Sequence, residues 1–146
     1  MSTNAVIAVR TNENTVKAIY LHWDGYIEHA GKLLIKNYNS LEMAEKIVNL
    51  GDLSSLKKRL SPNKDEIHSF EKPIHDVTVA YHRDRGEDLN IIELPWSENS
   101  QYMLNILKET VPSAEYAYIF NDNKWFVADC EHDTELKPLS LYGSNS

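Results

Sequence analysis

The densest group of chemically capable side chains is the run His22-Trp23-Asp24-Gly25-Tyr26. It combines an imidazole, a carboxylate and two aromatic faces, which are groups that a small-molecule site uses to bind and orient its ligand. The residues before it have a strand pattern and those after it a helix pattern. A strand-to-helix loop would therefore present these side chains next to backbone N–H groups suited to an anion. A packing interpretation stays open, in which Asp24 caps the helix and the two aromatic rings pack against the sheet.

A second charged group lies in the run from Tyr81 to Asp88, where His82, Arg83 and Arg85 follow a predicted strand. Two arginines at the end of a strand can bind a phosphate or a carboxylate in a bidentate geometry. The acidic residues of the same run offer the alternative that the arginines are neutralised in exposed ion pairs, which contribute little stability. Together the two groups give the candidate ligand-binding residues: His22, Trp23, Asp24, Tyr26, His82, Arg83 and Arg85.

The sequence predicts no metal centre and no cofactor. His22 and Asp24 have i, i+2 spacing, as do His82 and Asp84. A hydrolytic metal site needs three or more converging ligands, and no spacing requires these pairs to meet. Cys130 has acidic neighbours whose charges raise the pKa of a thiol. The chain has no Gly-x-Ser-x-Gly elbow and no glycine-rich phosphate loop. The sequence therefore names no catalytic residue; it favours a non-enzymatic protein and leaves catalysis open.

Composition narrows the class of protein further. The 146 residues, 42% hydrophobic and 25% charged, fit one globular domain. One cysteine allows no intrachain disulfide, which fits a reducing compartment. The first residues have no signal-peptide pattern, and the apolar runs are far shorter than the ~20 residues that span a bilayer, so we expect no membrane partner. The net charge of −7 makes nucleic acid an unlikely partner, since Lys57-Lys58-Arg59 is the only basic run.

The elements that must position these residues follow from periodicity and turn signals. The first half predicts strands at 5–10 and 15–22 joined as a hairpin, a helix from 26 to 38, a helix from 39 or 40 to 50, and a short helix at 53–60. Asp24 and Asp52 stand at the expected N-caps of the first and third helices, and Gly51 at the end of the second. The second half predicts a polar loop at 61–73, strands at 77–82 and 90–94, a helix at 100–111, and a hairpin of strands at 116–120 and 124–128.

These elements predict an α+β fold with an antiparallel sheet from two hairpins plus a central strand, and about three helices packed on one face. Residues 1–135 are expected to form a single domain and residues 136–146 a flexible C-terminal tail. In the last hairpin, Tyr116, Tyr118 and Phe120 alternate on one strand, opposite either Trp125 and Val127 or Phe126 and Ala128 on the other. This pattern indicates cross-strand packing, with a partner-binding face as the alternative.

Three runs form a longer pattern: His22-Trp23-Asp24-Gly25-Tyr26 followed by Glu28, Gly31, Leu34 and Tyr38; Leu50-Gly51-Asp52-Leu53-Ser54-Ser55-Leu56; and Val77-Thr78-Val79-Ala80-Tyr81-His82-Arg83-Asp84-Arg85-Gly86-Glu87-Asp88. The pattern resembles a family of small phage and prophage proteins of unassigned function. The resemblance covers residues 6–88 and departs at Ile27, where the family pattern has proline. It implies a context rather than a reaction: an accessory protein in the cytoplasm of a bacterial host that acts by binding a host component.

The leading hypothesis is therefore a phage-encoded small binding protein that inhibits or sequesters a host component, as in counter-defence. Its partner would be a host protein or a small nucleotide-like ligand. One alternative is a small metal-dependent hydrolase or nuclease acting on nucleotides, with Asp24, His82, Asp84 and Glu87 as ligands or general base. Another is a structural or regulatory module that forms a homo-oligomer through a hairpin edge.

Overall fold

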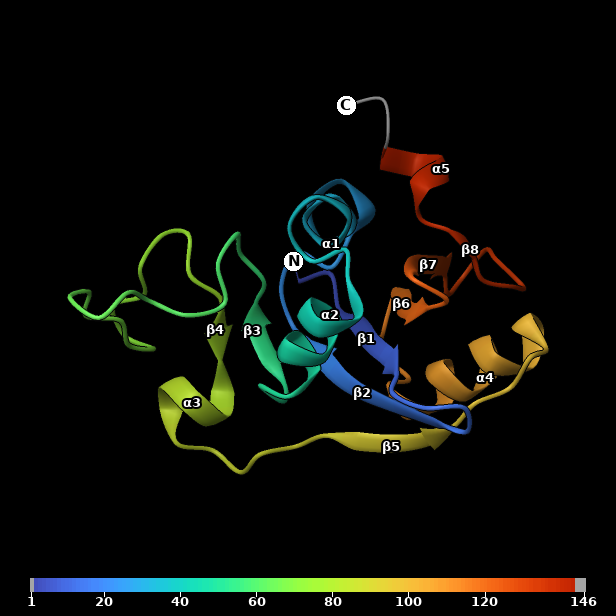
Figure 1. Cartoon of the computed structure of the whole chain (residues 1–146), viewed down its shortest axis with the longest axis horizontal. Helices are drawn as coiled ribbons and strands as arrows, with labels where there is room; N and C mark the ends of the chain where they lie inside the picture. The colour runs from blue at the N-terminus through green and yellow to red at the C-terminus, as the bar shows by residue number, and fades with distance from the viewer. Residues whose placement is uncertain (1, 144–146) are drawn as a thin grey trace.

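The computed structural model describes residues 2–143. Its elements in chain order are β1 Ala5–Arg10, β2 Thr15–Leu21, η1 Ile27–Gly31, α1 Lys32–Asn37, α2 Leu41–Val48, β3 Leu53–Ser55, β4 Val79–Ala80, α3 Tyr81–Arg85, β5 Ile92–Pro95, α4 Ser100–Thr110, β6 Tyr116–Asn121, β7 Lys124–Asp129, β8 Lys137–Pro138 and α5 Ser140–Gly143. Within these residues eight strands form one sheet, in the order β4-β3-β2-β1-β6-β7-β8, with β5 paired to β2 (Figure 1). The predicted α+β class is confirmed.

Both predicted hairpins are present. β1 and β2 pair antiparallel with Ala8 opposite Ala18, and β6 and β7 pair antiparallel. The β6–β7 turn consists of Asp122 and Asn123, whose φ angles of 54° and 61° lie in the left-handed region. Two successive positive φ angles are the signature of the tight turn that matches the twist of a hairpin.

The sheet is mixed, because the two hairpins are joined by parallel pairing. β1 runs parallel to β6, and β2 runs parallel to β3. The N-terminal hairpin therefore lies in the middle of the sheet, where residues 5–9 have no solvent exposure. Parallel pairing joins strands that are distant in the sequence, so turn signals alone predict only the antiparallel part.

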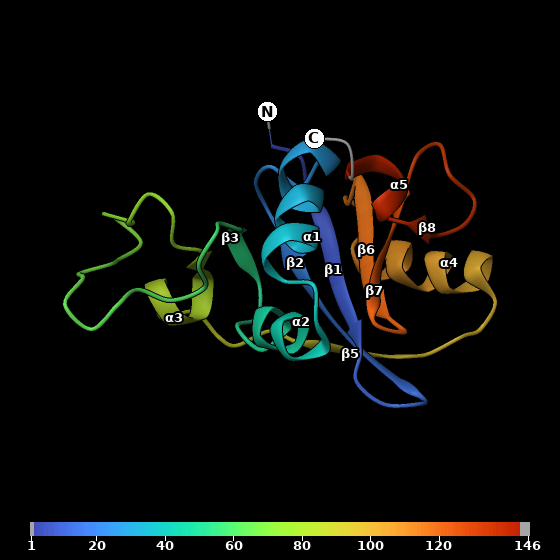
Figure 2. The same ribbon diagram turned by 45° about the horizontal axis from the view of Figure 1, so that its top comes forward.

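Helices cover both faces of the sheet, and not one face as predicted (Figure 2). Side chains of β1 alternate between the faces. Ile7 belongs to a core that contains Leu34 of α1, whereas Ala8 belongs to a second core that contains Met103 and Leu107 of α4. The aromatic residues of the last hairpin are packing residues, because Trp125 is only 2% exposed and its indole N–H donates to the Tyr38 carbonyl at 3.0 Å.

The predicted short helix at 53–60 is instead the strand β3. Leu53 pairs with Leu21 at the end of β2, and its side chain is buried. Asp52 does not cap a helix; its Oδ1 accepts a hydrogen bond from the Tyr20 amide at 2.9 Å. The spacing of the leucines suits a helix, but pairing with the open edge of β2 satisfies the backbone and buries the same side chains.

The first helix does not begin at Asp24. It begins as a π-helical turn at Ile27, and Tyr26 in the N-cap position makes no capping hydrogen bond through its side chain. The Gly25 amide donates to the Thr3 carbonyl at 2.8 Å, and Asp24 has a φ angle of 57°. The bond from Gly25 to Thr3 holds residues 24 and 25 beside the N-terminal segment. The helix therefore begins at Ile27, later than an N-cap at Asp24 would predict.

Two further boundaries differ from the expectation. The strand predicted at 77–82 is only Val79–Ala80, and the charged run continues as α3, which ends at Gly86 with a φ angle of 76°. At the C-terminal end, Lys137–Pro138 of the segment expected as a flexible tail pair with β7 as β8, and Leu139 is buried; residues 144–146 of that prediction lie outside the described residues. No helix among the described residues has the length and apolarity that crossing a membrane requires.

Candidate functional site

The turn after β2 is held by backbone hydrogen bonds on both sides. The Trp23 amide donates to the Ser54 carbonyl of β3 at 3.0 Å, and the Gly25 amide donates to Thr3. The hydroxyl of Tyr118, a buried residue of β6, donates to the Gly25 carbonyl at 2.7 Å. Trp23 is 44% exposed, which is unusual for so large an apolar side chain. The backbone of this turn is therefore held firmly in place, and the Trp23 indole ring is exposed at the surface.

Asp24 occupies the most constrained position of this turn. Its positive φ angle costs free energy for any residue other than glycine, although aspartate tolerates it better than most. The side chain is half-buried, and its carboxylate forms no hydrogen bond or ion pair within the described part of the chain. A carboxylate in this state is available to a ligand.

His22 and Tyr26 lie on either side of the turn. His22 Nδ1 is 2.7 Å from the Tyr20 hydroxyl, and its ring packs edge-on against Trp23 with 4.6 Å between centroids. Tyr26 is 37% exposed, and its ring lies 6.1 Å from that of His29. His22 therefore supports the indole, whereas Tyr26 faces the start of the helix.

Arg83 of the second charged run is bound within the protein. Its guanidinium donates to the Leu60 carbonyl at 2.6 Å and to the Thr78 carbonyl at 2.7 Å. The same group donates to both carboxylate oxygens of Asp84, at 2.9 and 3.0 Å. These bonds tie the two ends of the loop between β3 and β4 to α3, so Arg83 has a positioning role.

Asp84 is the centre of a buried polar cluster. Its side chain is 5% exposed and accepts from the Ala80 amide at 2.8 Å and from His68 Nε2 at 3.3 Å; the His68 side chain is 1% exposed. His68 Nδ1 accepts from the Ile74 amide, so the proton of the neutral ring resides on Nε2. Burial raises the pKa of Asp84, but hydrogen bonds from Arg83 and from the Ala80 amide outweigh it and lower the pKa overall.

Arg85 and His82 make local contacts at the surface. The guanidinium of Arg85 stacks over Phe70 at 4.3 Å and over Tyr81 at 4.9 Å, and it forms an ion pair with Glu87. His82 Nδ1 bonds to the Glu87 carbonyl at 2.7 Å. The arginine thus supports the ring of Phe70 from α3.

A cavity of about 640 Å³ lies between the Trp23 turn and the loop that joins β3 to β4. We call it the aromatic cavity. It is lined by Trp23, Asp24, Ser54, Ser55, Lys57, Phe70, Pro73, Ile74, His75, Val77 and Val79. Its volume is within the range of ordinary small-molecule sites. Two aromatic rings, one free carboxylate and two basic groups surround it.

A second cavity, of about 520 Å³, shares Lys57 and His75 with the first. We call it the lysine cavity. Its lining residues are Glu28, His29, Lys32, Leu33, Lys36, Asn37, Lys57, Lys58, His75 and Asp76. Because the two cavities have two lining residues in common, they are neighbouring compartments of one surface.

Comparisons of the chain with family models, with curated proteins and with solved structures found no match. The geometry of the two neighbouring cavities therefore carries the functional argument.

The structure brings some of the predicted site residues together and places others elsewhere. Trp23 and Asp24 line the aromatic cavity, and His22 packs against Trp23. Arg85 reaches the cavity only through the ring of Phe70. The remaining predicted residues, Tyr26, His82 and Arg83, do not line it.

Sequence reasoning missed the basic residues of the lysine cavity. Lys57 and Lys58 belong to the only basic run, which by itself suggested too few charges for a binding surface. Lys32 and Lys36 have the i, i+4 spacing that places two side chains on one face of a helix. That spacing was the available signal, but nothing in the sequence places α1 beside the segment after β3.

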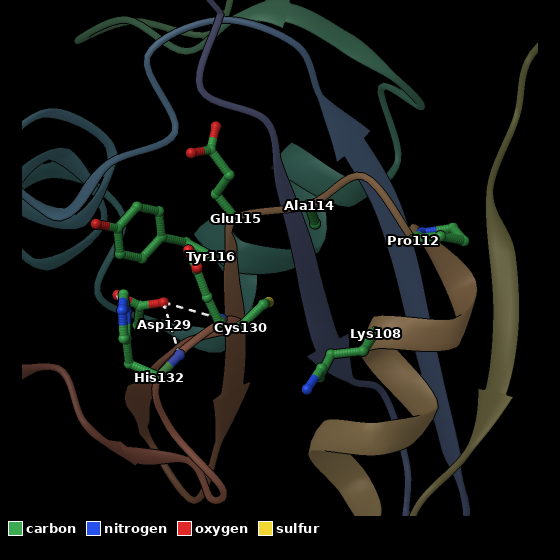
Figure 3. Close-up of a pocket in the computed structure, with 9 residues that line it drawn as sticks. Lys108, Pro112, Ala114, Glu115, Tyr116, Asp129, Cys130 and His132 are labelled. Atoms are coloured by element: carbon green, nitrogen blue, oxygen red, sulfur yellow. Dashed lines mark hydrogen bonds and ion pairs between the residues drawn. The ribbon is translucent and has the colours of Figure 1, made fainter.

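A third cavity, of about 470 Å³, lies between α4 and the ends of β6 and β7 (Figure 3). The Cys130 side chain and the His132 ring point in opposite directions there. Burial raises the pKa of the Cys130 thiol to about 11, with Asp129 and Asp133 adding to the increase. His132 instead bonds to Asp129 at 3.0 Å. The predicted direction of the shift in the Cys130 pKa is confirmed, but its main cause is burial and not the acidic neighbours; a thiol with a raised pKa is a poor nucleophile.

The residue set of the hydrolase alternative does not converge. Asp84 is buried against Arg83 and His68, whereas Asp24 lies on the aromatic cavity. Within residues 2–143, no three His, Cys, Asp or Glu side chains lie close enough together to hold a metal ion.

Proposed function

We propose that this chain is a phage-encoded, non-enzymatic binding protein that sequesters a small nucleotide-like ligand of its host, and that the aromatic cavity is its binding site. The observation that carries the proposal is the composition of this cavity. It places the exposed Trp23 ring and the Phe70 ring around a space of about 640 Å³ with Lys57 and His75 at its edge. A nucleotide presents the complementary groups, a flat base and an anion.

Stacking on an aromatic side chain suits this role because every base has a π-face, and each stacked base contributes about 1–3 kcal/mol. The free carboxylate of Asp24 adds an acceptor for the amino or hydroxyl groups of such a ligand. The turn that carries Trp23 and Asp24 is fixed by backbone bonds to Ser54 and Thr3, so little order has to be created on binding.

Binding is favoured over catalysis by the hydrogen-bond pattern. His75 and Asp24 lie on the same cavity as Ser54 and Ser55, but in the described residues neither bonds to a serine hydroxyl. A hydroxyl within hydrogen-bond reach of its base is the usual signature of an activated nucleophile. The resemblance to phage accessory proteins supports the same role, since sequestration of a host component needs affinity and no turnover.

The test is calorimetric titration of the full chain with nucleoside monophosphates, combined with native mass spectrometry of the protein purified from a bacterial host. We expect binding of at least one nucleotide, and a loss of affinity of about 10- to 100-fold in Trp23→Ala. Tyr102→Ala is the matched control, because Tyr102 is 59% exposed on α4 and lines neither cavity. Both variants should keep the wild-type melting temperature. Equal affinity in wild type and Trp23→Ala would refute the proposal, as would a wild type that binds no nucleotide.

A further inference from the structure

We infer that the ligand carries two or more phosphate groups and that the lysine cavity binds them. The inference rests on the proposed function for the position of the base and adds the chemical class of the remainder of the ligand. Four lysines, Lys32, Lys36, Lys57 and Lys58, line this one cavity, in a chain whose net charge is −7. Four positive charges therefore gather in one place on a chain that is negatively charged as a whole.

The charge of these lysines is not neutralised by the protein. None of the four forms an ion pair in the part of the chain that the structure describes. The cavity contains two carboxylates, but Asp76 accepts two hydrogen bonds from Arg59, at 2.8 and 3.1 Å. Glu28 is left as the opposing charge. An excess of unpaired ammonium groups suits a multiply charged anion, and each ammonium offers three donors to phosphate oxygens.

The segment that carries Lys57 is held in place by buried side chains. The Lys57 amide donates to the Thr78 hydroxyl at 3.0 Å, and its carbonyl accepts from the Tyr38 hydroxyl. Thr78 has no solvent exposure and Tyr38 has 1%. Both backbone polar groups of this lysine are therefore fixed from the core, and only its side chain remains free to reach a ligand.

The two shared residues determine how one ligand would occupy both cavities. Lys57 and His75 line the aromatic cavity and the lysine cavity alike. A base stacked beside Trp23 would direct its first phosphate towards Lys57, and further phosphates would meet Lys32 and Lys36 of α1. A nucleic acid is a poorer occupant, because the net charge of −7 on the chain opposes an extended phosphate backbone.

The experiment compares nucleoside, nucleoside monophosphate and nucleoside triphosphate of the adenosine and guanosine series, together with inorganic tripolyphosphate, on the full chain. We expect the triphosphate to bind at least about tenfold more tightly than the monophosphate, because charge-assisted hydrogen bonds are the stronger class. The double variant Lys32→Gln/Lys36→Gln should lose this preference and keep the monophosphate affinity. Lys46→Gln/Lys124→Gln, which removes two exposed lysines outside both cavities, is the matched control and should keep the preference.

The outcomes separate the two proposals. Equal affinity for monophosphate and triphosphate would overturn the inference about the lysine cavity and leave the proposed function standing. Tripolyphosphate that binds as tightly as a nucleoside triphosphate, with no effect of Trp23→Ala, would support the lysine cavity and overturn the aromatic site. A triphosphate preference that survives in Lys32→Gln/Lys36→Gln would also overturn the inference, since the phosphates would then bind elsewhere.

Discussion

Replacing Gly25 by alanine tests how closely the turn under the aromatic cavity approaches the N-terminal strand. A Cβ atom on Gly25 would lie 2.7 Å from the Ala5 Cβ and 2.8 Å from the Thr3 carbonyl oxygen. Neither contact can be relieved by rotating a side chain, so the turn must shift. Overpacking of this kind costs about 1–3 kcal/mol, and displacement of the turn would weaken its bonds to Thr3 and Tyr118 at about 1 kcal/mol each. We expect a total loss of about 3–5 kcal/mol.

For a chain of this length an unfolding entropy of roughly 2.1 cal/mol/K per residue converts that loss into a fall of about 10–16 °C in Tm. Gly86→Ala is the matched control, because Gly86 has a φ angle of 76° and nothing within 4 Å of an added Cβ. Its cost is conformational only, about 1 kcal/mol, or about 3 °C. Circular dichroism melting of both variants decides the matter. If Gly25→Ala melts within ~2 °C of the wild type, or above Gly86→Ala, the close approach of the turn to β1 is not real.

Three further predictions concern the charged and titratable groups. Asp84→Ala should lower the free energy of unfolding in urea by about 3 kcal/mol, because it leaves buried donors without an acceptor; a loss below about 1 kcal/mol would contradict the buried cluster. At pH 8, Cys130 in the folded chain should react with iodoacetamide about 100-fold more slowly than in the unfolded chain, and equal rates would argue against its raised pKa. Hydrogen bonds from Arg59 lower the pKa of Glu66 and of Asp76 in the folded chain. The stability that these two carboxylates contribute is therefore complete above their unfolded pKa, near ~4, and is lost as the pH falls through their lower folded pKa. The melting temperature of the wild type should therefore fall more between pH 5 and pH 2 than the melting temperature of Arg59→Gln. These pH limits lie about one to two units either side of the unfolded pKa. If the two melting temperatures fall in parallel, the ion pairs of Arg59 contribute nothing to stability.

The parts of the fold that the sequence predicts correctly are those with local causes. The β6–β7 hairpin follows from Asp122 and Asn123, which accept the positive φ angles of a tight turn. Helix α2 follows from its apolar period, with the Ser40 hydroxyl accepting from the Met43 amide at 3.2 Å. Neither requires knowledge of any distant part of the chain.

The errors occur where a distant segment decides the local structure. Residues 53–60 have helical spacing, but the open edge of β2 recruits Leu53 into a strand. Asp24 has the sequence context of an N-cap, but the bond from Gly25 to Thr3 gives it a left-handed conformation. Lys32 and Lys57 are 25 positions apart and meet only because α1 packs beside the segment that follows β3. Tertiary pairing overrides local propensity in the first two cases, and in the third only tertiary packing brings the two residues to one cavity.

The charged run at α3 illustrates how residues that attract attention in a sequence can act without contacting a ligand. Arg83 binds the carbonyls of Leu60 and Thr78, which stand at the two ends of the loop between β3 and β4, and Asp84 holds His68 inside it. This loop extends beyond the end of the sheet formed by β3 and β4 (Figures 1 and 2), and the bonds of Arg83 and Asp84 hold its two ends and its interior together. The loop supplies Phe70 and His75 to the aromatic cavity. Arg83 and Asp84 contribute to the cavity indirectly, because they hold this loop in place. The arginines of this run therefore shape one wall of the candidate site, whereas the basic residues that line it, Lys57 and His75, come from the loop itself.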